Sequence, residues 1–219
     1  ESTLGYNVGV VSEYRYRGLG QTKGDPALQG GVDYAHSSGL YVGAWGSSIK
    51  WIKDAGNGAK GPVELDIYGG YKFEAAGLAY DVGYLRYQYV GNTYDKVGVN
   101  ANTDEVYGAA TYGVTTLKYS YAFSDLFGTA NSKGSTYWDL SATFDLGQGY
   151  SIVPHAGHQS VKNATTSYTD LALTLNKDLG DGLVASVSAI STNGKAATFT
   201  TPSGYNPAKS IVVVGVKYS

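Results

Sequence analysis

The chain has 219 residues, with 31 glycines and 21 tyrosines but no cysteine and no methionine. Its net charge of −2 gives no reason to expect a nucleic-acid partner, and we find no cofactor motif. A transmembrane helix needs about 20 mainly apolar residues in a row, whereas the longest apolar run, 211–216, contains Gly215. The alternative way to satisfy every backbone group in lipid is a closed barrel, whose sequence alternates with a two-residue period in segments of about ten residues.

The first predicted strand covers residues 3–16. Its apolar positions are Leu4, Tyr6, Val8, Val10, Tyr14 and Tyr16, and its polar positions are Gly5, Asn7, Gly9, Glu13 and Arg15. Successive side chains of a strand point to opposite faces, so the pattern predicts an apolar outer face and a polar inner face. A basic side chain that faces lipid at mid-depth costs about 2 to 4 kcal/mol, so charged residues within strands are expected to face the lumen.

Segments 63–73, 116–123 and 138–146 repeat this alternation, and two others depart from it. In the third strand, Leu40 and Val42 share one face while Ile49 and Trp51 share the other. This pattern predicts that the inward and outward alternation shifts by one residue within the strand. In the fifth strand, regular alternation after Tyr84 would place Arg86 in lipid. We therefore predict a β-bulge near Leu85 that turns Arg86 into the lumen.

The predicted connections alternate between short and long. The short ones are centred on 37–39, 75–77, 112–113, 147–149 and 180–182, and the long ones run through 17–27, 53–61, 92–102, 124–134, 161–166 and 194–208. Together they join twelve strands. Short turns are periplasmic in outer-membrane barrels, so both termini are expected in the periplasm. Because no basic, apolar leader precedes it, Glu1 is interpreted as the start of a processed chain. No linker divides residues 1–219, which predicts one domain.

Aromatic residues collect at both ends of the predicted strands, as amphipathic rings do at the two headgroup levels. Near the periplasmic ends lie Tyr34, Tyr71, Phe73, Tyr80, Tyr112, Phe144, Tyr150 and Tyr218; near the extracellular ends lie Tyr14, Tyr16, Trp51, Tyr121, Phe123 and Trp138. A soluble β-sandwich would also be rich in tyrosine. It would not require rings at both ends of nearly every strand, so the pattern favours a transmembrane barrel.

Several segments resemble the TorF-family porins of Gram-negative bacteria. They are 12–22 (SEYRYRGLGQT), 29–34 (QGGVDY), 39–47 (GLYVGAWGS), 80–84 (YDVGY), 105–107 (EVY), 118–121 (KYSY) with Asp125, and 154–157 (PHAG). The resemblance covers most of the chain and implies an outer-membrane barrel with a pore, without naming a solute. One departure is the end of the chain, Lys217-Tyr218-Ser219, where such barrels commonly end in phenylalanine. Either Tyr218 serves as the terminal lipid-facing aromatic residue, or a residue 220 is missing.

Two histidines are candidates for enzymatic or metal chemistry. His158 and Ser160 lie two positions apart and share a face, as the base and nucleophile of a surface lipid hydrolase would, with Asn163 or Asn176 as the orienting group. The same pair is also an ordinary occurrence at a strand end. His155 and His158 lie three apart, so they face opposite ways and cannot share a metal ion. We predict no enzyme, no metal and no cofactor.

Charged residues of the lumen are the predicted functional residues. Nine carboxylates and five basic groups are assigned inward by alternation, or six basic groups with Arg86. The proposed pore-lining set is Glu13, Arg15, Arg17, Glu64, Asp66, Arg86, Glu105, Lys118 and Asp139. Acidic groups on one wall and Arg15 and Arg17 on the other would set up a transverse field. Alternatively, these charged residues form a network of ion pairs that only fills a narrow barrel.

The sequence therefore predicts an outer-membrane pore for passive diffusion of small hydrophilic solutes or ions, weakly preferring cations. A closed structural or adhesive barrel that acts through its extracellular loops is the alternative, and a surface lipid hydrolase is a third hypothesis. The expected partners are outer-membrane lipids, including lipopolysaccharide, and further copies of the chain.

Overall fold

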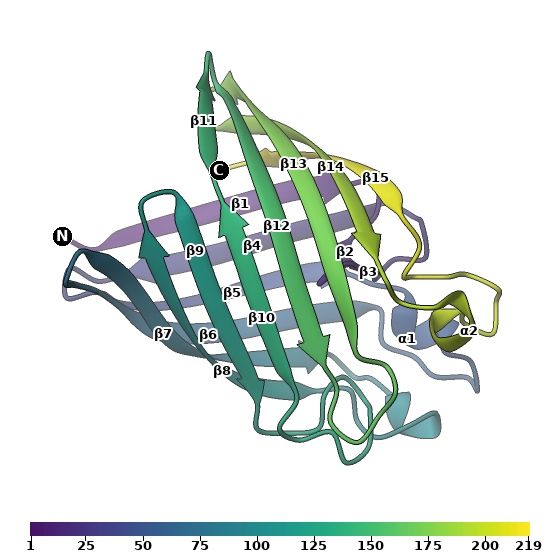
Figure 1. Ribbon diagram of the computed structural model, residues 1–219. Helices are drawn as coiled ribbons and strands as arrows, with labels where there is room; N and C mark the ends of the chain where they lie inside the picture. Colours follow the sequence, from purple (N-terminus) through teal and green to yellow (C-terminus); the bar gives the residue numbers. More distant parts are fainter.

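The computed structural model describes residues 1–219 as one closed antiparallel barrel (Figure 1). Its wall consists of β1 (Thr3–Val11), β4 (Ala27–Ala35), β5 (Leu40–Ser48), β6 (Val63–Ala75), β7 (Leu78–Tyr89), β8 (Thr103–Tyr112), β9 (Thr115–Ala122), β10 (Thr136–Ala142), β11 (Phe144–Gly147), β12 (Tyr150–Ser160), β13 (Tyr168–Gly180), β14 (Leu183–Thr192) and β15 (Ile211–Tyr218). β10 and β11 form one wall strand interrupted at Thr143, since both pair with β12. The pairing of β1 with β15 completes the ring, which confirms the predicted twelve strands.

The remaining elements are short and lie in the connections. They are the hairpin strands β2 (Arg15–Tyr16) and β3 (Leu19–Gly20), the helices α1 (Trp51–Asp54) and α2 (Ala196–Phe199), and the 3₁₀ turn η1 (Tyr94–Lys96). No helix is long and apolar enough to cross a bilayer.

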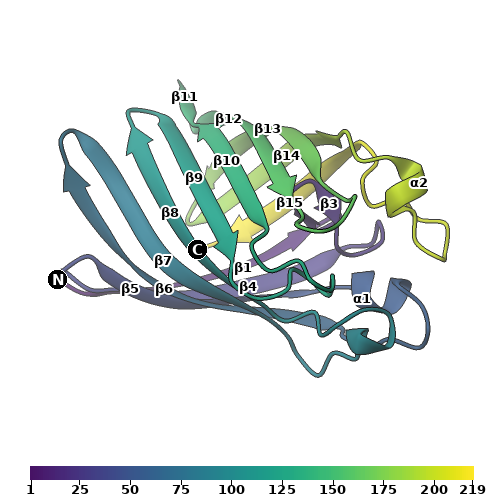
Figure 2. The same ribbon diagram turned by 60° about the horizontal axis from the view of Figure 1, so that its bottom comes forward.

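Short turns gather at one end of the barrel, here named the turn end, and six longer connections gather at the other, the loop end (Figures 1 and 2). Ala76 and Gly77 have φ values of 54° and 81°, and positive φ at both central residues gives the turn a twist that matches the two strands it joins. Both termini lie at the turn end, as Figure 1 shows. The predicted alternation of connections is confirmed.

The outer wall is apolar and the inner wall polar. Tyr6, Leu117 and Leu140 are 66%, 45% and 47% exposed on the outer face. On β6 the carboxylates Glu64 and Asp66 are buried inside, while their neighbours Val63 and Ile67 are exposed outside. Apolar side chains cover the outer face of every wall strand, far more than a soluble monomer exposes, so the wall is built for lipid. The predicted face assignment is confirmed.

Aromatic rings form the predicted girdle at the turn end, where Phe73 stacks between Tyr71 and Tyr80 with ring centroids 5.5 and 5.1 Å away. At the loop end, Phe123 and Trp138 are exposed outside as predicted. The outward placement of Tyr14, Tyr16 and Trp51 is wrong.

Those three rings face the interior because their strands end early. β1 ends at Val11, and the Ser12 hydroxyl accepts a hydrogen bond from the Val214 amide at 3.0 Å before the chain turns inward. β5 ends at Ser48, so Ile49 and Trp51 belong to a connection and the register of β5 needs no slip.

The predicted bulge in β7 is also wrong. β7 pairs regularly with β6 and β8, so Tyr87 points inward and Arg86 points outward. The Arg86 guanidinium donates to Asp104 at 2.7 Å and to Gln88 at 3.0 Å. This pairing near the loop end neutralises the charge, which removes the reason for a bulge.

Tyrosine rings inside the barrel pack over glycines of neighbouring strands. Tyr41 covers Gly70, Tyr68 covers Gly43 and Tyr107 covers Gly83, each at a place where a Cβ would overlap the ring. The glycines therefore give the rings room to lie flat along the wall.

We expect Gly83→Ala to destabilise the barrel by about 1 to 3 kcal/mol, the usual effect of overpacking. The matched control is Gly108→Ala on the adjacent strand, where the nearest atom to a Cβ would be Val82 Cγ1 at 3.9 Å. Denaturant unfolding followed by gel mobility measures the difference. Equal stability of the two variants would contradict this packing.

Candidate functional site

The first long connection folds back into the barrel as a hairpin, named here the plug hairpin (residues 15–20). β2 and β3 pair through Arg15 with Gly20 and Tyr16 with Leu19. The turn residues Arg17 and Gly18 both have positive φ, at 47° and 78°. A Cβ at Gly18 would lie 2.6 Å from the Cβ of Asp170 on β13, so only glycine lets the tip approach that wall.

Arg17 occupies the tip of the plug hairpin and is almost fully buried, with 7% of its side chain exposed. Its guanidinium donates to both carboxylate oxygens of Glu105 on β8, at 2.8 and 3.0 Å, and to Gln159 on β12 at 3.0 Å. The Arg17 Cζ atom lies 4.4 Å from the centre of the Tyr137 ring. Two-point contact of this kind is the strongest geometry that arginine offers a carboxylate.

The hairpin tip is also held by hydroxyl groups. The Tyr168 hydroxyl donates to the Arg17 carbonyl at 2.7 Å, and the hydroxyls of Tyr16 and Tyr87 are hydrogen-bonded to each other. Tyr87 donates in turn to Glu105 at 3.0 Å. The plug hairpin thus contacts wall strands on opposite sides of the lumen.

The base of the hairpin is bound to the loop formed by residues 193–210. Arg15 pairs with Glu13 at 2.8 Å and donates to the Lys209 carbonyl at 2.8 Å. The Tyr205 hydroxyl donates to Glu13. Burial, together with this hydrogen bond, raises the pKa of Tyr205 to about 12, so the phenol stays protonated and donates at neutral pH.

Two buried carboxylates lie on β6. Glu64 accepts from the Tyr14 hydroxyl at 3.1 Å. Asp66 is 8% exposed, and its Oδ1 atom has no hydrogen-bond partner. Its carboxyl group lies within hydrogen-bonding reach of Glu64, and two adjacent buried carboxyl groups share a proton rather than both ionise.

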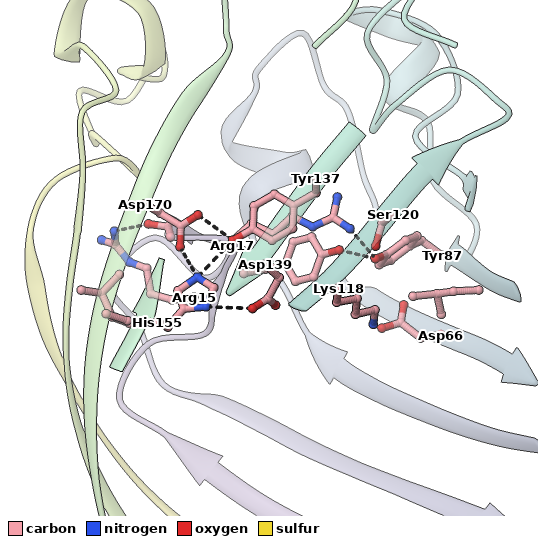
Figure 3. A pocket seen from close by; sticks show the side chains of 15 residues that line it. Arg15, Arg17, Asp66, Tyr87, Lys118, Ser120, Tyr137, Asp139, His155 and Asp170 are labelled. Atoms are coloured by element: carbon pink, nitrogen blue, oxygen red, sulfur yellow. Dashed lines mark hydrogen bonds and ion pairs between the residues drawn. The ribbon is translucent and has the colours of Figure 1, made fainter. Parts of the chain in front are cut away.

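A histidine between two carboxylates lies on the far side of the lumen (Figure 3). His155 on β12 contacts Asp139 on β10 through Nδ1 at 3.1 Å and Asp170 on β13 through Nε2 at 2.7 Å. The Tyr137 hydroxyl also donates to Asp170, at 2.6 Å. No group of His, Asp and Glu side chains has the arrangement of a metal site.

These side chains surround a cavity of about 350 Å³, named the lumen cavity (Figure 3). Its walls include Asp66, Lys118, Asp139, His155 and Asp170, and the plug residues Tyr16 and Arg17 border it. Lys118 makes no ion pair; its ammonium lies 4.3 Å from the centre of the Tyr107 ring. The cavity therefore presents a basic group that no carboxylate neutralises.

A second cavity of about 270 Å³ lies among the connections of the loop end and is named the loop chamber. Tyr16 and Arg17 border this chamber as well as the lumen cavity. The plug hairpin therefore separates the two spaces along the barrel axis.

The structure places eight of the nine predicted pore residues inside the barrel: Glu13, Arg15, Arg17, Glu64, Asp66, Glu105, Lys118 and Asp139. Arg86 is outside. The predicted separation of acid and base on opposite walls is wrong for Arg17, which contacts Glu105 directly because it sits on an inserted hairpin rather than on the wall.

The histidine predictions have mixed outcomes. His155 and His158 face opposite ways, as expected: His155 borders the lumen cavity and His158 is exposed outside. The hydrolase arrangement is not assembled: the nearest polar partner of His158 Nδ1 is Thr169 at 2.9 Å, and Asn163 donates to the Asn131 carbonyl. The cluster of His155 with Asp139 and Asp170 was missed. Alternation placed both aspartates inward, but only the strand register brings the three together.

We expect Glu105→Gln to release the plug hairpin. A hydrogen bond to a charged group contributes about 1.5 to 3 kcal/mol, so opening should become about ten- to a hundred-fold more frequent. Trypsin cleavage after Arg15 and Arg17, followed by mass spectrometry, reports this opening. Asp104→Asn, which breaks the outer Arg86 pair, is the matched control and should leave cleavage unchanged; similar rates in both variants would exclude the proposed anchor.

Comparison with known proteins assigns the chain to a family. A family model described as "Bacterial protein of unknown function (Gcw_chp)" matches residues 1–219, so the chain belongs to that family. No comparison confirms the resemblance to TorF-family porins. No curated protein matches the sequence.

Solved structures of similar shape are outer-membrane proteins. The KdgM porin has a TM-score of 0.62 at 9% identity, with 100% of this chain and 99% of that chain covered. The NanC porin has a TM-score of 0.61 at 10% identity, with 98% and 100% covered. An outer membrane channel from Pseudomonas putida F1 has a TM-score of 0.52 at 13% identity, with 98% and 94% covered. At these identities the likeness shows the barrel fold alone.

Proposed function

We propose that the protein is an outer-membrane channel for passive diffusion of small hydrophilic solutes or ions, narrowed by its plug hairpin. The lumen cavity is the observation that carries this proposal. Side chains that merely filled a barrel would be paired throughout, as Arg17 and Glu105 are. On the turn-end side of the plug hairpin, Lys118 has no carboxylate partner and borders the lumen cavity, so this part of the lumen suits water and polar solutes.

The barrel fold supports the same function, because KdgM and NanC are porins of this fold. One KdgM structure is described as a complex with disordered oligogalacturonate, which shows a hydrophilic oligomer associated with that porin. The solute of the present chain is proposed only by class.

Orientation follows from the connections. With short turns in the periplasm and longer loops outside, both termini are periplasmic. The six connections of the loop end (residues 12–26, 49–62, 90–102, 123–135, 161–167 and 193–210) carry eleven Lys and Arg against five Asp and Glu. Basic side chains at this level can bind the phosphates of lipopolysaccharide, which we propose as the surrounding lipid. Association with further copies of the chain stays a prediction.

Charge selectivity should come from the lumen. The wall strands and short turns, with the chain ends, carry five Lys and Arg against thirteen Asp and Glu. Several of the carboxylates, including Asp33, Asp66 and Asp81, face inward. Weak preference for cations is therefore proposed.

A closed structural or adhesive barrel is the second candidate. The plug hairpin favours it, because Arg17 is bound on several sides and blocks the axis between the two cavities. Channel recordings distinguish a barrel that this plug narrows from one that it shuts.

We expect single barrels in planar bilayers to show small, stable conductance steps. Arg17→Ala should raise the conductance by about two-fold or more, because it removes the side chain that lies between the lumen cavity and the loop chamber. Arg86→Ala on the outer face is the control and should not change it. Silence in all three proteins would favour the closed barrel.

Reversal potentials under a salt gradient test the selectivity. Asp139→Asn should reduce the preference for cations, and Lys118→Gln should increase it, since both line the lumen cavity. Asp104→Asn removes a carboxylate from the outer face and serves as the control. If the two lumen variants keep the wild-type reversal potential while still conducting, these charges do not set selectivity.

A further inference from the structure

Lysine is not balanced by acid on one side of the loop end. The three connections that follow β9, β12 and β14 carry four lysines against one acidic residue, Asp125, whereas the three that follow β1, β5 and β7 carry seven Lys and Arg against four Asp and Glu. Asp125 is engaged within its own loop, where its Oδ1 atom accepts from the Ser132 amide at 3.0 Å. The strands of this side add no acid to the outer surface near the loop end, because Asp139 and Asp170 face the lumen. This side therefore meets the membrane with an excess of positive charge.

Two of the four lysines are held next to each other by buried serines. The Lys162 amide donates to the Ser135 hydroxyl at 2.9 Å, and that hydroxyl donates to the Ser132 carbonyl at 2.6 Å. Ser132 and Ser135 are 0% and 1% exposed. One more hydrogen bond, of 2.8 Å, joins the same two connections. The backbone segments that carry Lys133 and Lys162 are thus fixed side by side, while both lysine side chains stay exposed and form no ion pair.

The Lys162 side chain extends along the outer rim to Tyr121 on β9. A Cβ at Gly134 would lie 3.4 Å from the Lys162 Nζ atom and 3.6 Å from the Tyr121 hydroxyl oxygen, so the ammonium and the phenol converge beside this glycine. Lys133 directly precedes Gly134. The two ammonium groups and the phenol form no hydrogen bond within the protein, so three free donors gather in one small area of the rim.

Next to these donors, toward the turn end, the outer wall is first aromatic and then aliphatic. Trp138 on β10 and Tyr119 on β9 are register partners with ring centroids 4.7 Å apart, and Trp138 is 47% exposed. Leu117 and Leu140, the next outward pair of the same strands, are 45% and 47% exposed. Donors, rings and aliphatic side chains therefore follow one another in the order of the phosphate, the sugar and the acyl chains of a membrane glycolipid.

We propose that Lys133, Lys162 and Tyr121 bind a phosphate of lipopolysaccharide, whose acyl chains lie against Leu117 and Leu140. A phosphate monoester carries a charge of about −1.5 to −2 at neutral pH, so it suits two ammonium groups better than the single negative charge of a phospholipid diester does. The identity of the lipid rests on the proposed orientation, which places the loop end in the outer leaflet. The binding does not require that the barrel conducts.

Native mass spectrometry of the delipidated barrel in detergent tests the proposal, with lipid A, the phosphorylated end of lipopolysaccharide, and phosphatidylglycerol as the probes. Wild type should bind lipid A about five-fold more tightly than phosphatidylglycerol, or better. Lys133→Gln combined with Lys162→Gln should weaken lipid A binding about twenty-fold, because each lysine near an anionic lipid contributes a gain of roughly five-fold. Lys133→Arg combined with Lys162→Arg keeps both charges and should bind as wild type does. Gel mobility shows whether each variant is folded.

The matched control is Lys23→Gln combined with Lys50→Gln. It removes the same charge from two connections on the other side, where these lysines pair with Asp54 and Asp25, and it should leave lipid A binding unchanged. Equal weakening by both glutamine double variants, no weakening by the first of them, equal affinity of wild type for the two lipids, or no binding of lipid A would overturn the proposal. A barrel that is silent in bilayers but binds lipid A as expected would refute the channel alone. A conducting barrel whose lipid A binding ignores the first double variant would refute this site alone.

Discussion

The closed ladder of backbone hydrogen bonds is the constraint on which the rest of the molecule depends. Because β1 pairs with β15 and β10 with β12, the ring of strands closes, and the wall can stand in lipid with apolar side chains outside. Strict alternation then directs every second side chain inward. Polar chemistry is thereby confined to the lumen, where glycines opposite tyrosines such as Tyr107 leave room for large rings.

Within that lumen, the pairing of Arg17 with Glu105 separates two environments. Both side chains are almost fully buried. A buried ion pair is stable only when its remaining donors and acceptors also form hydrogen bonds. Gln159, Tyr87 and the ring of Tyr137 meet this need at the tip of the plug hairpin. On the turn-end side of this ion pair, the charged side chains of the lumen cavity are incompletely paired. On the loop-end side, the walls of the loop chamber are aromatic. The inserted hairpin therefore divides the interior of the barrel into two different cavities, the polar lumen cavity and the aromatic loop chamber.

Alternation and loop length were sufficient to predict the strands, their faces, the turn end and most lumen charges, because these depend on a local two-residue period. They failed where a residue's surroundings are set by distant segments. Tyr14 and Tyr16 continue the alternation of β1 although the strand has ended, since the hairpin that follows is itself extended. Arg86 tolerates the outer face because Asp104, its register partner on β8, neutralises it. The contacts of His155 likewise span three strands that only the register aligns.

The attachments of the plug hairpin indicate how it can move without unfolding the wall. Its base is bound to the loop of residues 193–210 through Glu13 and Arg15, and the hairpin itself contributes no hydrogen bond to the barrel ladder. The same loop reaches Asp54, the last residue of α1, where the Thr201 hydroxyl donates at 2.6 Å. Burial opposes ionisation of Asp54, but hydrogen bonds from Ser203 and Thr201 and the charge of Lys23 lower its pKa. Withdrawal of the plug therefore requires this loop to shift with it, while the strands stay paired.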